Sequence, residues 1–303
     1  MNPYFSVVIP TYNRADLILE TLESVFNQTF KDFEIIVVDN GSKDNTLEIL
    51  KQFEDNNQIQ IIRIPENIER ARARNEGFKK AKGQYLTLLD SDDFMYEDNL
   101  KDAFEFSTKN AFDFFHNYFE LVNSKKEVLY SYRYPKPKNH IKALANGNFI
   151  SCIGVFISKK VYENYFFNEN EQVLGSEDWE LWLRVISEFK LGVIPKVNNG
   201  VRFHKGRSIS AYNLESIIER KMYIIDSVFK LDKVIKTFGK YKQEMISSSY
   251  VFAAIIANEN KLYKAAKKYL KKALKLNSKL ILDPRFVWVF IRTNFKLSKK
   301  YQN

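Results

Sequence analysis

The segment Tyr85-Leu86-Thr87-Leu88-Leu89-Asp90-Ser91-Asp92-Asp93 joins an apolar run directly to three carboxylates. The apolar part has the length and composition of a strand buried on both faces. In open α/β sheets, ligands bind beyond the carboxyl ends of the strands. Three like charges at such an end repel one another, and a divalent cation with oxygen ligands relieves the repulsion. The segment therefore predicts Mg²⁺ or Mn²⁺ holding a phosphate. The alternative, an Asp that caps the next helix, accounts for one carboxylate but not for three.

Three strand–helix units precede this segment. The expected strands cover 5–9, 33–38 and 59–64, and the expected helices cover 16–27, 46–53 and 68–81. Strands that alternate with helices are typical of a parallel sheet with right-handed crossovers. Polar residues follow the first two strands at Pro10-Thr11-Tyr12-Asn13 and Asp39-Asn40-Gly41-Ser42, on the edge where a nucleotide would bind. No G-x-G-x-x-G follows a strand, which disfavours a dinucleotide fold.

The remainder of the chain is less regular and then becomes helical. Further strands are expected at 113–122, 127–132, 155–158, 191–194 and 197–203, and further helices at 100–107 and 177–188, with a loop at 133–140. After about residue 210 the pattern is wholly helical. We therefore expect a first domain over 1–210, with a nucleotide half to about residue 95 and an acceptor half after it, and a helical region over 211–303.

Composition limits the class of protein. The 303 residues are 45% hydrophobic and 15% aromatic, which suits a sizeable core, and the single cysteine, Cys152, excludes an internal disulfide and fits a reducing compartment. No signal peptide is visible at the start, and no apolar run approaches the roughly 20 residues that cross a bilayer. These features predict a cytoplasmic protein, with peripheral contact to the inner face of the cytoplasmic membrane left open.

The net charge of +10 is confined to the C-terminal part. From Lys261 onward there are 13 Lys/Arg and one acid, Asp283, whereas the first 260 residues have a net charge of −2. Nucleic-acid binding would require basic residues around the main groove as well, so we expect none. A stripe of lysines marks one face of an expected helix over 262–276: Lys264, Lys267, Lys268, Lys271, Lys272 and Lys275.

Two interpretations of this basic helix are open. It has the form of a helix that lies on an anionic membrane surface. Alternatively, Tyr269, Leu270, Ala273 and Leu276 pack on neighbouring helices and the lysines are simply solvated. Dimerisation through the apolar face is a further binding mode.

The chain resembles the family 2 glycosyltransferases over about residues 5–210. The resemblance rests on five motifs in the family's order: Ser6 to Asn13, Asp39-Asn40-Gly41-Ser42, Ala73-Arg74-Asn75, Asp90-Ser91-Asp92-Asp93 and Glu177-Asp178-Trp179. It implies an α/β fold of the GT-A type, with a parallel or mixed sheet, helices on both faces and, in this chain, a helical C-terminal extension. It also implies inverting transfer from a nucleotide-sugar, with UDP-sugar the expected donor, usually with a divalent metal.

The resemblance assigns roles to particular residues. The resemblance implies that the donor is bound by residues of the first two motifs, of a following loop and helix, and of the carboxylate segment. These residues are Pro10, Thr11, Tyr12, Asp39, Asn67, Arg74, Asp90 and Ser91. Asp39 would accept a hydrogen bond from uracil. Asp92 is the expected direct metal ligand, with Asp90 and His204 as further contacts to metal or diphosphate. Arg207, close behind His204, is a candidate for holding the diphosphate.

The resemblance implies that Asp178 is the catalytic base and that Glu177 lies beside it, toward the acceptor. Inverting transfer needs a carboxylate that deprotonates the acceptor hydroxyl and a group that stabilises the departing diphosphate. The dipole of the helix that begins here would keep Asp178 ionised. On their own, these two acids could simply cap the helix.

The sequence departs from the family pattern at two places. Asn40 stands where a second Asp is common. The segment that often reads Asn-x-Gly-x-Ser here reads Asn67-Ile68-Glu69-Arg70-Ala71, which leaves the contacts of that loop open but not those of Arg74.

These observations predict a metal-dependent inverting glycosyltransferase, acting on a glycan or lipid-linked acceptor in bacterial surface polysaccharide assembly. A nucleotidyltransferase is the rival enzyme, although it would carry a glycine-rich loop with basic residues after the first strand. A non-catalytic nucleotide-sugar binding protein is the rival from another class.

Overall fold

The structure, a computed structural model of the chain, describes residues 2–132, 139–203 and 214–297. The chain forms two compact units. The sheet unit comprises Met1–Lys138, Ile150–Glu171 and Arg184–Arg207, and the helical unit comprises Asn139–Phe149, Gln172–Leu183 and Ser208–Asn303. The helical unit thus includes two short segments from the part of the chain that we assign to an acceptor half.

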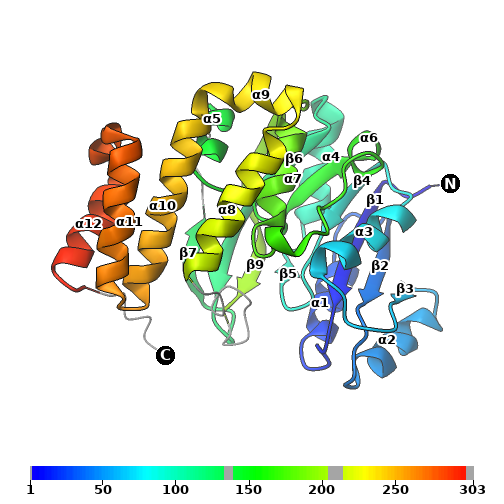
Figure 1. Cartoon of the computed structure of the whole chain (residues 1–303). Coiled ribbons are helices and arrows are strands. Elements are labelled where there is room, and N and C mark those ends of the chain that lie inside the picture. The colour runs from blue at the N-terminus through cyan, green and yellow to red at the C-terminus, as the bar shows by residue number, and fades with distance from the viewer. Residues whose placement is uncertain (1, 133–138, 204–213, 298–303) are drawn as a thin grey trace. The chain divides into compact units, whose positions relative to one another are not determined.

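The sheet unit contains a mixed sheet (Figure 1). Its strands are β1 Phe5–Thr11, β2 Phe33–Asp39, β3 Gln60–Arg63, β4 Tyr85–Leu88, β5 Phe94–Met95, β6 Phe114–Val122, β7 Val128–Tyr132, β8 Val155–Ser158 and β9 Leu191–Arg202. Their order is β3-β2-β1-β4-β8-β6-β9-β5, with β7 paired to β6. The strands from β3 to β4 are parallel, and β8 runs antiparallel to both of its neighbours.

Helices cover both faces of the parallel part. The helices of the sheet unit are α1 Ile18–Phe26, α2 Thr46–Glu54, α3 Arg70–Lys80, α4 Asn99–Lys109 and α6 Lys159–Tyr162. Alternate residues of β1 pack in one cluster with residues of α1 and α2, whereas Val8, between them, points to α3. A Cβ at Gly77 of α3 would lie 2.2 Å from Val8 Cγ1, so glycine is required for this close approach. The predicted α/β class is confirmed.

The carboxyl ends of β1, β2 and β4 meet at one edge of the sheet. In the parallel register Thr11 lies opposite Asp39, and Val8 lies opposite Leu88, two residues before Asp90. The polar loops that the sequence placed at one edge are therefore neighbours. This edge is the part of the fold that matters for function.

One expectation about the strands was wrong. Residues 191–194 and 197–203 were expected as two strands, but they form the single strand β9. The register between β6 and β9 shifts by two extra residues between Val193 and Val197 of β9, where Pro195 and Lys196 are exposed, and by one more between Val197 and Asn199. Proline lacks the N–H that a ladder needs and is accommodated at such a bulge, so the strand continues past it.

The helical unit is built from antiparallel helices (Figure 1). It contains α5 His140–Ala145, the first part of α7 Glu177–Ile186, α8 Leu214–Val228, α9 Asp232–Phe238, α10 Lys242–Glu259, α11 Tyr263–Leu276 and α12 Pro284–Asn294, with the 3₁₀ turns Glu171–Val173, Gly239–Tyr241 and Ser278–Leu282. Small residues on α10 let α11 approach closely, and both pack with α12 in one apolar cluster. Within the described residues, no helix has the length and hydrophobicity needed to cross a membrane.

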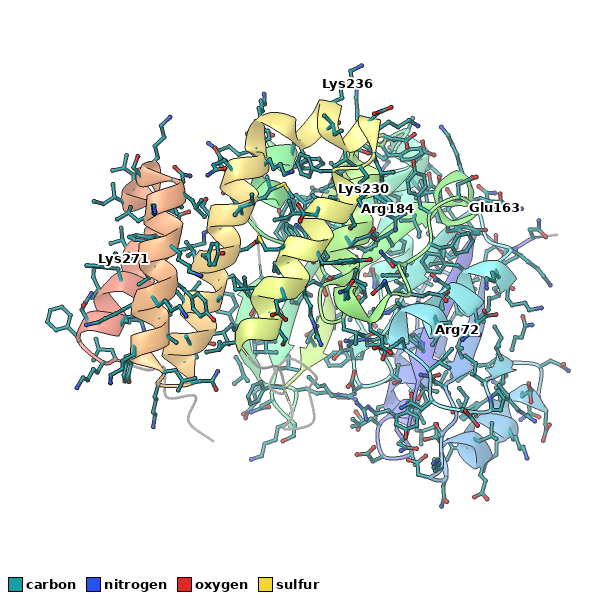
Figure 2. The ribbon with its side chains drawn as sticks, viewed as in Figure 1. Arg72, Glu163, Arg184, Lys230, Lys236 and Lys271 are labelled. Atoms are coloured by element: carbon teal, nitrogen blue, oxygen red, sulfur yellow. The ribbon has the colours of Figure 1, made fainter. Side chains whose placement is uncertain are left out.

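The expected basic helix is α11, with its lysines exposed; Figure 2 labels one of them, Lys271. Ala266, Tyr269, Leu270 and Ala273 are buried in the cluster with α10 and α12, whereas Leu276, also expected to pack, is exposed. The buried side of α11 therefore packs on neighbouring helices, as the second of the two interpretations expects.

Candidate active site

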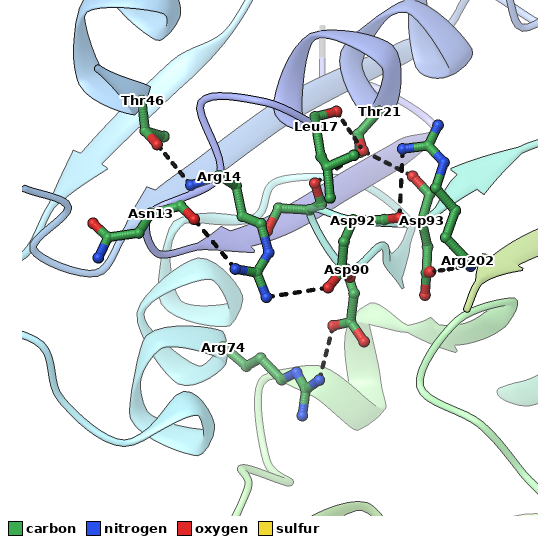
Figure 3. Close-up of polar contacts among 11 residues, drawn as sticks. Asn13, Arg14, Leu17, Thr21, Thr46, Arg74, Asp90, Asp92, Asp93 and Arg202 are labelled. Atoms are coloured by element: carbon green, nitrogen blue, oxygen red, sulfur yellow. Dashed lines mark hydrogen bonds and ion pairs between the residues drawn. The ribbon is translucent and has the colours of Figure 1, made fainter. Parts of the chain in front are cut away.

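Each of the three carboxylates after β4 has its own cationic or N–H partner (Figure 3). Arg74 Nη2 lies 2.9 Å from Asp90 Oδ1, and Arg14 Nη2 lies 3.2 Å from Asp92 Oδ2. Asp93 Oδ1 accepts a hydrogen bond of 2.9 Å from the backbone N–H of Arg202. The mutual repulsion expected from the sequence is therefore already relieved by protein groups, which corrects the argument that a cation is needed for that purpose.

The turn that carries these acids is held by a side chain of α1. Thr21 Oγ1 of α1 donates to the carbonyl oxygens of Ser91 at 3.1 Å and Asp93 at 2.8 Å. Ser91 and Asp93 are buried, whereas the side chains of Asp90 and Asp92 are 31% and 19% exposed. Asp93 is thus part of the scaffold, and Asp90 and Asp92 are the carboxylates available to a ligand.

This donor set fits a divalent cation that also binds a diphosphate. Among the described residues, no three His, Cys, Asp or Glu side chains gather closely enough to hold a metal alone. Mg²⁺ in proteins typically takes one or two carboxylates and completes its shell with substrate phosphates and water. Asp90 and Asp92 supply that number of carboxylates. His204 and Arg207, the other predicted contacts to metal or diphosphate, lie outside the described residues.

Arg74 is held in place by contacts on α3 and on the segment after α6. Its side chain is only 3% exposed, and the guanidinium carbon lies 5.3 Å from the centre of the Phe167 ring. The next residue, Asn75, fixes that ring's backbone, because its side chain donates to Phe167 O at 2.9 Å and accepts from Phe167 N at 2.8 Å. A buried, oriented guanidinium beside Asp90 suits recognition of phosphate oxygens.

At the ends of β1 and β2, two buried oxygen atoms lack hydrogen-bond partners in the described part of the chain. These atoms are Thr11 Oγ1 and Asp39 Oδ1, and each residue is 3% exposed. A buried polar atom without a partner costs about 1–3 kcal/mol, and more when it is charged. Because Thr11 and Asp39 are register neighbours, both oxygens lie at one point of the sheet edge. A ligand that offers N–H or O–H groups there would satisfy them.

Asn40 fastens the loop that contains Asn67. Its side-chain nitrogen donates to Asn67 Oδ1 at 2.9 Å and to Ile68 O at 2.7 Å, and its oxygen accepts from Ile68 N at 3.0 Å. Gly41, with φ of +78°, lets the same loop approach, since a Cβ there would lie 2.7 Å from Glu66 C. The departure at Asn40 thus has a structural reason, because an Asp could accept but not donate.

Replacing Asn40 by Asp should lower the free energy of unfolding by about 1–3 kcal/mol, because a carboxylate would face two oxygen acceptors. Urea denaturation at neutral pH measures this change. Asn2→Asp, at an exposed position before β1, is the matched control and should change stability by less than about 0.5 kcal/mol. Equal stabilities of Asn40→Asp and wild type would contradict the proposed role of Asn40 in fixing the loop.

The second predicted group, Glu177 and Asp178, begins α7 in the helical unit. Asp178 Oδ1 accepts from the N–H of Trp179 at 2.7 Å, and Oδ2 accepts from Asn148 Nδ2 at 2.8 Å. Glu177 is 4% exposed, whereas Asp178 is partly exposed and lines a cavity of about 320 Å³. These bonds fix the orientation of the Asp178 carboxylate.

Lys221 of α8 reaches the same cavity. Its ammonium lies 4.1 Å from the centre of the Trp179 ring. Burial lowers the pKa of Lys221 to about 8, and the negative charges of Asp178 and then Glu177 oppose that shift. Trp179 itself is 2% exposed and donates through Nε1 to Leu144 O at 2.9 Å, so it belongs to the core.

Sequence reasoning missed four residues of these two groups: Arg14, Arg202, Asn148 and Lys221. Arg14 stands one residue after the first motif, and a basic residue in a loop beyond a strand is a signal that could have been used. Asn148 and Lys221 lie 30 and 43 positions from Asp178, and no sequence pattern links them to it.

Comparison with known proteins bears on the group at the sheet edge, because the family match ends before Glu177 and Asp178. The sequence model described as "Glycosyl transferase family 2" matches residues 6–166, a little more than half of the chain. An uncharacterized glycosyltransferase of Rickettsia conorii is 28% identical over 86% of this chain and 42% of its own length, so the chain spans well under half of that relative. The Escherichia coli protein WfaP, a UDP-Glc:alpha-D-GlcNAc-diphosphoundecaprenol beta-1,3-glucosyltransferase, is 31% identical over 74% of this chain and 86% of its own length.

Solved structures share the fold. TarS of S. aureus, in a complex with UDP-GlcNAc, superposes with a TM-score of 0.70 at 20% identity, covering 98% of this chain and 89% of that chain. The mannosyltransferase PcManGT of Pyrobaculum calidifontis, with GDP-Man and Mn²⁺, gives a TM-score of 0.63 at 15% identity, covering 98% and 87%. The family match spans the polar segments after β1 and β2 and the Asp90–Asp93 turn after β4, and from it we conclude that the chain belongs to glycosyl transferase family 2.

Proposed function

We propose that this protein is a metal-dependent inverting glycosyltransferase that transfers a hexosyl or N-acetylhexosaminyl group from a UDP-sugar. The observation that carries the proposal is the pair of buried oxygens, Thr11 Oγ1 and Asp39 Oδ1, at the sheet edge. A nucleoside base with an N–H group would satisfy the Asp39 carboxylate through a charge-assisted hydrogen bond. Pro10 and Tyr12 flank Thr11 and complete this end of the donor site.

The bases offer different donors to the Asp39 carboxylate. Uracil donates from its ring N3–H, whereas cytosine offers only its exocyclic N4 amine, so the carboxylate alone does not choose between these two bases. Guanine also carries a ring N–H, and one structural neighbour is described with GDP-Man. The names of two E. coli relatives, WfaP and WfgD, give UDP-Glc as donor, which supports uracil.

The diphosphate would lie between the nucleoside end and the carboxylate turn. Asp90 and Asp92, with Ser91 between them, would hold Mg²⁺ or Mn²⁺ together with the phosphate oxygens, and Asn67 and Arg74 would approach the nucleotide. The cation would neutralise the charge that develops on the departing nucleoside diphosphate. Arg14 pairs with Asp92 and Arg74 with Asp90 at this turn.

The acceptor hydroxyl would be deprotonated by Asp178, with Glu177 beside it. Asp178 accepts a hydrogen bond from Asn148 and lines the same cavity as Lys221, which suits a carboxylate that takes a proton from the acceptor. Within this proposal the acceptor half covers about residues 96–210 and the C-terminal region follows. The relatives WfaP and TuaG, named for an undecaprenol-linked acceptor and for teichuronic acid biosynthesis, support a glycan or lipid-linked acceptor in bacterial surface polysaccharide assembly.

Calorimetry with UDP and Mn²⁺ tests the donor site. Asp39→Ala should weaken UDP binding about 10- to 100-fold, because a hydrogen bond to a charged group is worth about 1.5–3 kcal/mol. GDP binding by wild type should be weaker than UDP binding. Asp32→Ala, at an exposed acid before β2, is the matched control and should bind UDP as wild type does. Equal UDP affinities of Asp39→Ala and wild type would show that Asp39 does not bind the donor, which would contradict the proposal.

A further inference from the structure

Helix α12 is apolar on two opposite faces. Phe286 and Val289 are buried against α10 and α11. Large apolar side chains on the rest of α12 and on the segments before and after it are exposed. We name these residues the α12 face: Ile281, Leu282, Val287, Trp288, Phe290, Ile291, Phe295 and Leu297.

The exposure of this face is far beyond what scattered surface residues show. Leu282 is 82% exposed, Phe295 72%, Ile281 62% and Phe290 50%. Soluble monomers rarely display a contiguous apolar patch of this kind, and a helix that is apolar all round is normally buried. Exposure of this extent is typical of an interaction surface.

Basic residues flank the α12 face in the sequence. The exposed lysines of α11 precede it, Lys279 and Lys296 lie at its two ends in the sequence, and Arg292 stacks on Trp288, 4.5 Å from the ring centre. The single acid between Lys261 and the end of the chain, Asp283, is paired with Arg285 at 2.8 Å and leaves the positive charge of the region nearly uncompensated. The partner must thus be apolar and anionic together.

We propose that the α12 face docks on the surface of an anionic lipid bilayer. Trp and Phe side chains favour the boundary between head groups and acyl chains, and flanking Lys residues bind anionic lipids. The apolar contact comes from α12 and its flanks and not from α11, whose apolar side is buried in the protein. Docking would bring the enzyme to a surface where a lipid-linked acceptor resides.

Two other kinds of partner match the residues of the α12 face and its flanking lysines less well. A second copy of the chain, joined through this face, would bring two lysine-rich helices toward each other and add like-charge repulsion. A nucleic acid would neutralise the lysines but leave Leu282, Phe290 and Phe295 in water.

Flotation of the full chain with phosphatidylcholine vesicles, with and without phosphatidylglycerol, tests the proposal. Wild type should float with the anionic vesicles and stay in solution with the neutral ones. Leu282→Ser combined with Phe290→Ser should reduce binding at least tenfold, because both side chains would insert. Lys271→Gln combined with Lys275→Gln should also reduce binding about tenfold, and high salt should reproduce that loss for wild type.

Matched controls use exposed residues of the same types in the sheet unit. Leu129→Ser combined with Tyr130→Ser, and Lys125→Gln combined with Lys190→Gln, should bind vesicles as wild type does. Unchanged thermal unfolding shows that each variant is folded. Light scattering separates the alternative: a dimer that Leu282→Ser with Phe290→Ser dissociates, without any vesicle binding by wild type, would overturn the proposal. Equal loss in the control variants would overturn it as well.

Discussion

Asp178→Asn should lower the rate of sugar transfer about 10²- to 10⁴-fold while leaving the affinity for the UDP-sugar within about twofold of wild type. The asparagine has the shape of the aspartate but cannot take the acceptor's proton. Release of UDP in the presence of Mn²⁺ and a GlcNAc-diphosphate lipid, the acceptor type named for the E. coli relative, measures the rate. Calorimetry with the UDP-sugar measures the affinity.

Asp226→Asn, at an exposed carboxylate of α8, is the matched control and should transfer sugar at the wild-type rate. Wild-type turnover by Asp178→Asn would show that Asp178 is not the catalytic base. Equal loss of donor affinity and turnover would instead give Asp178 a role in donor binding. Because a binding protein without catalysis would show no turnover in wild type either, the same assay separates the enzyme from that rival.

Asp92→Ala should abolish the strengthening of UDP-sugar binding by Mn²⁺, a loss of about 10- to 100-fold in affinity. The physical reason is that the cation would keep only one protein carboxylate, Asp90, in addition to the diphosphate. Titration of the UDP-sugar with Mn²⁺ and with EDTA gives the metal-dependent part of the affinity directly.

Two further variants sharpen this test. Glu97→Ala, at an exposed acid that follows the turn, should keep the full Mn²⁺ effect. Arg14→Ala removes the cation that pairs with Asp92, so Mn²⁺ should bind at least as well as in wild type. A Mn²⁺ effect that persists in Asp92→Ala would contradict the metal role of this carboxylate.

Much of the sheet edge could be predicted from the sequence, because local signals determine it. The run Tyr85–Leu89 is continuous apolar sequence before acids, and such a strand ends where its polar residues begin. Thr11 and Asp39 follow the same rule, and parallel pairing then places them together. The bounds of β1, β2, α2 and β4 accordingly differ from the expected ones by two residues or fewer.

The parts that could not be predicted depend on contacts between residues far apart in the chain. Arg202 meets Asp93 across 109 positions, and Asn148 meets Asp178 across 30. The interruption expected in β9 at Pro195 was wrong because tertiary pairing on both sides of a bulge outweighs a local break. Similarly, α11 has the pattern of a surface-binding helix, yet its apolar side is buried because α10 offers Ala253, Ala254 and Ala257 for close packing.

The most direct test of the account is a thermal-shift screen of UDP-, GDP-, CDP- and ADP-sugars with and without Mn²⁺. A ligand that binds only the folded state stabilises it by RT ln(1 + [L]/Kd), so the shift in Tm ranks the donors. We expect the largest shift for a UDP-sugar, an increase of that shift with Mn²⁺, and its loss in Asp39→Ala. No shift with any nucleotide-sugar, or shifts that are the same in Asp39→Ala and wild type, would contradict the account.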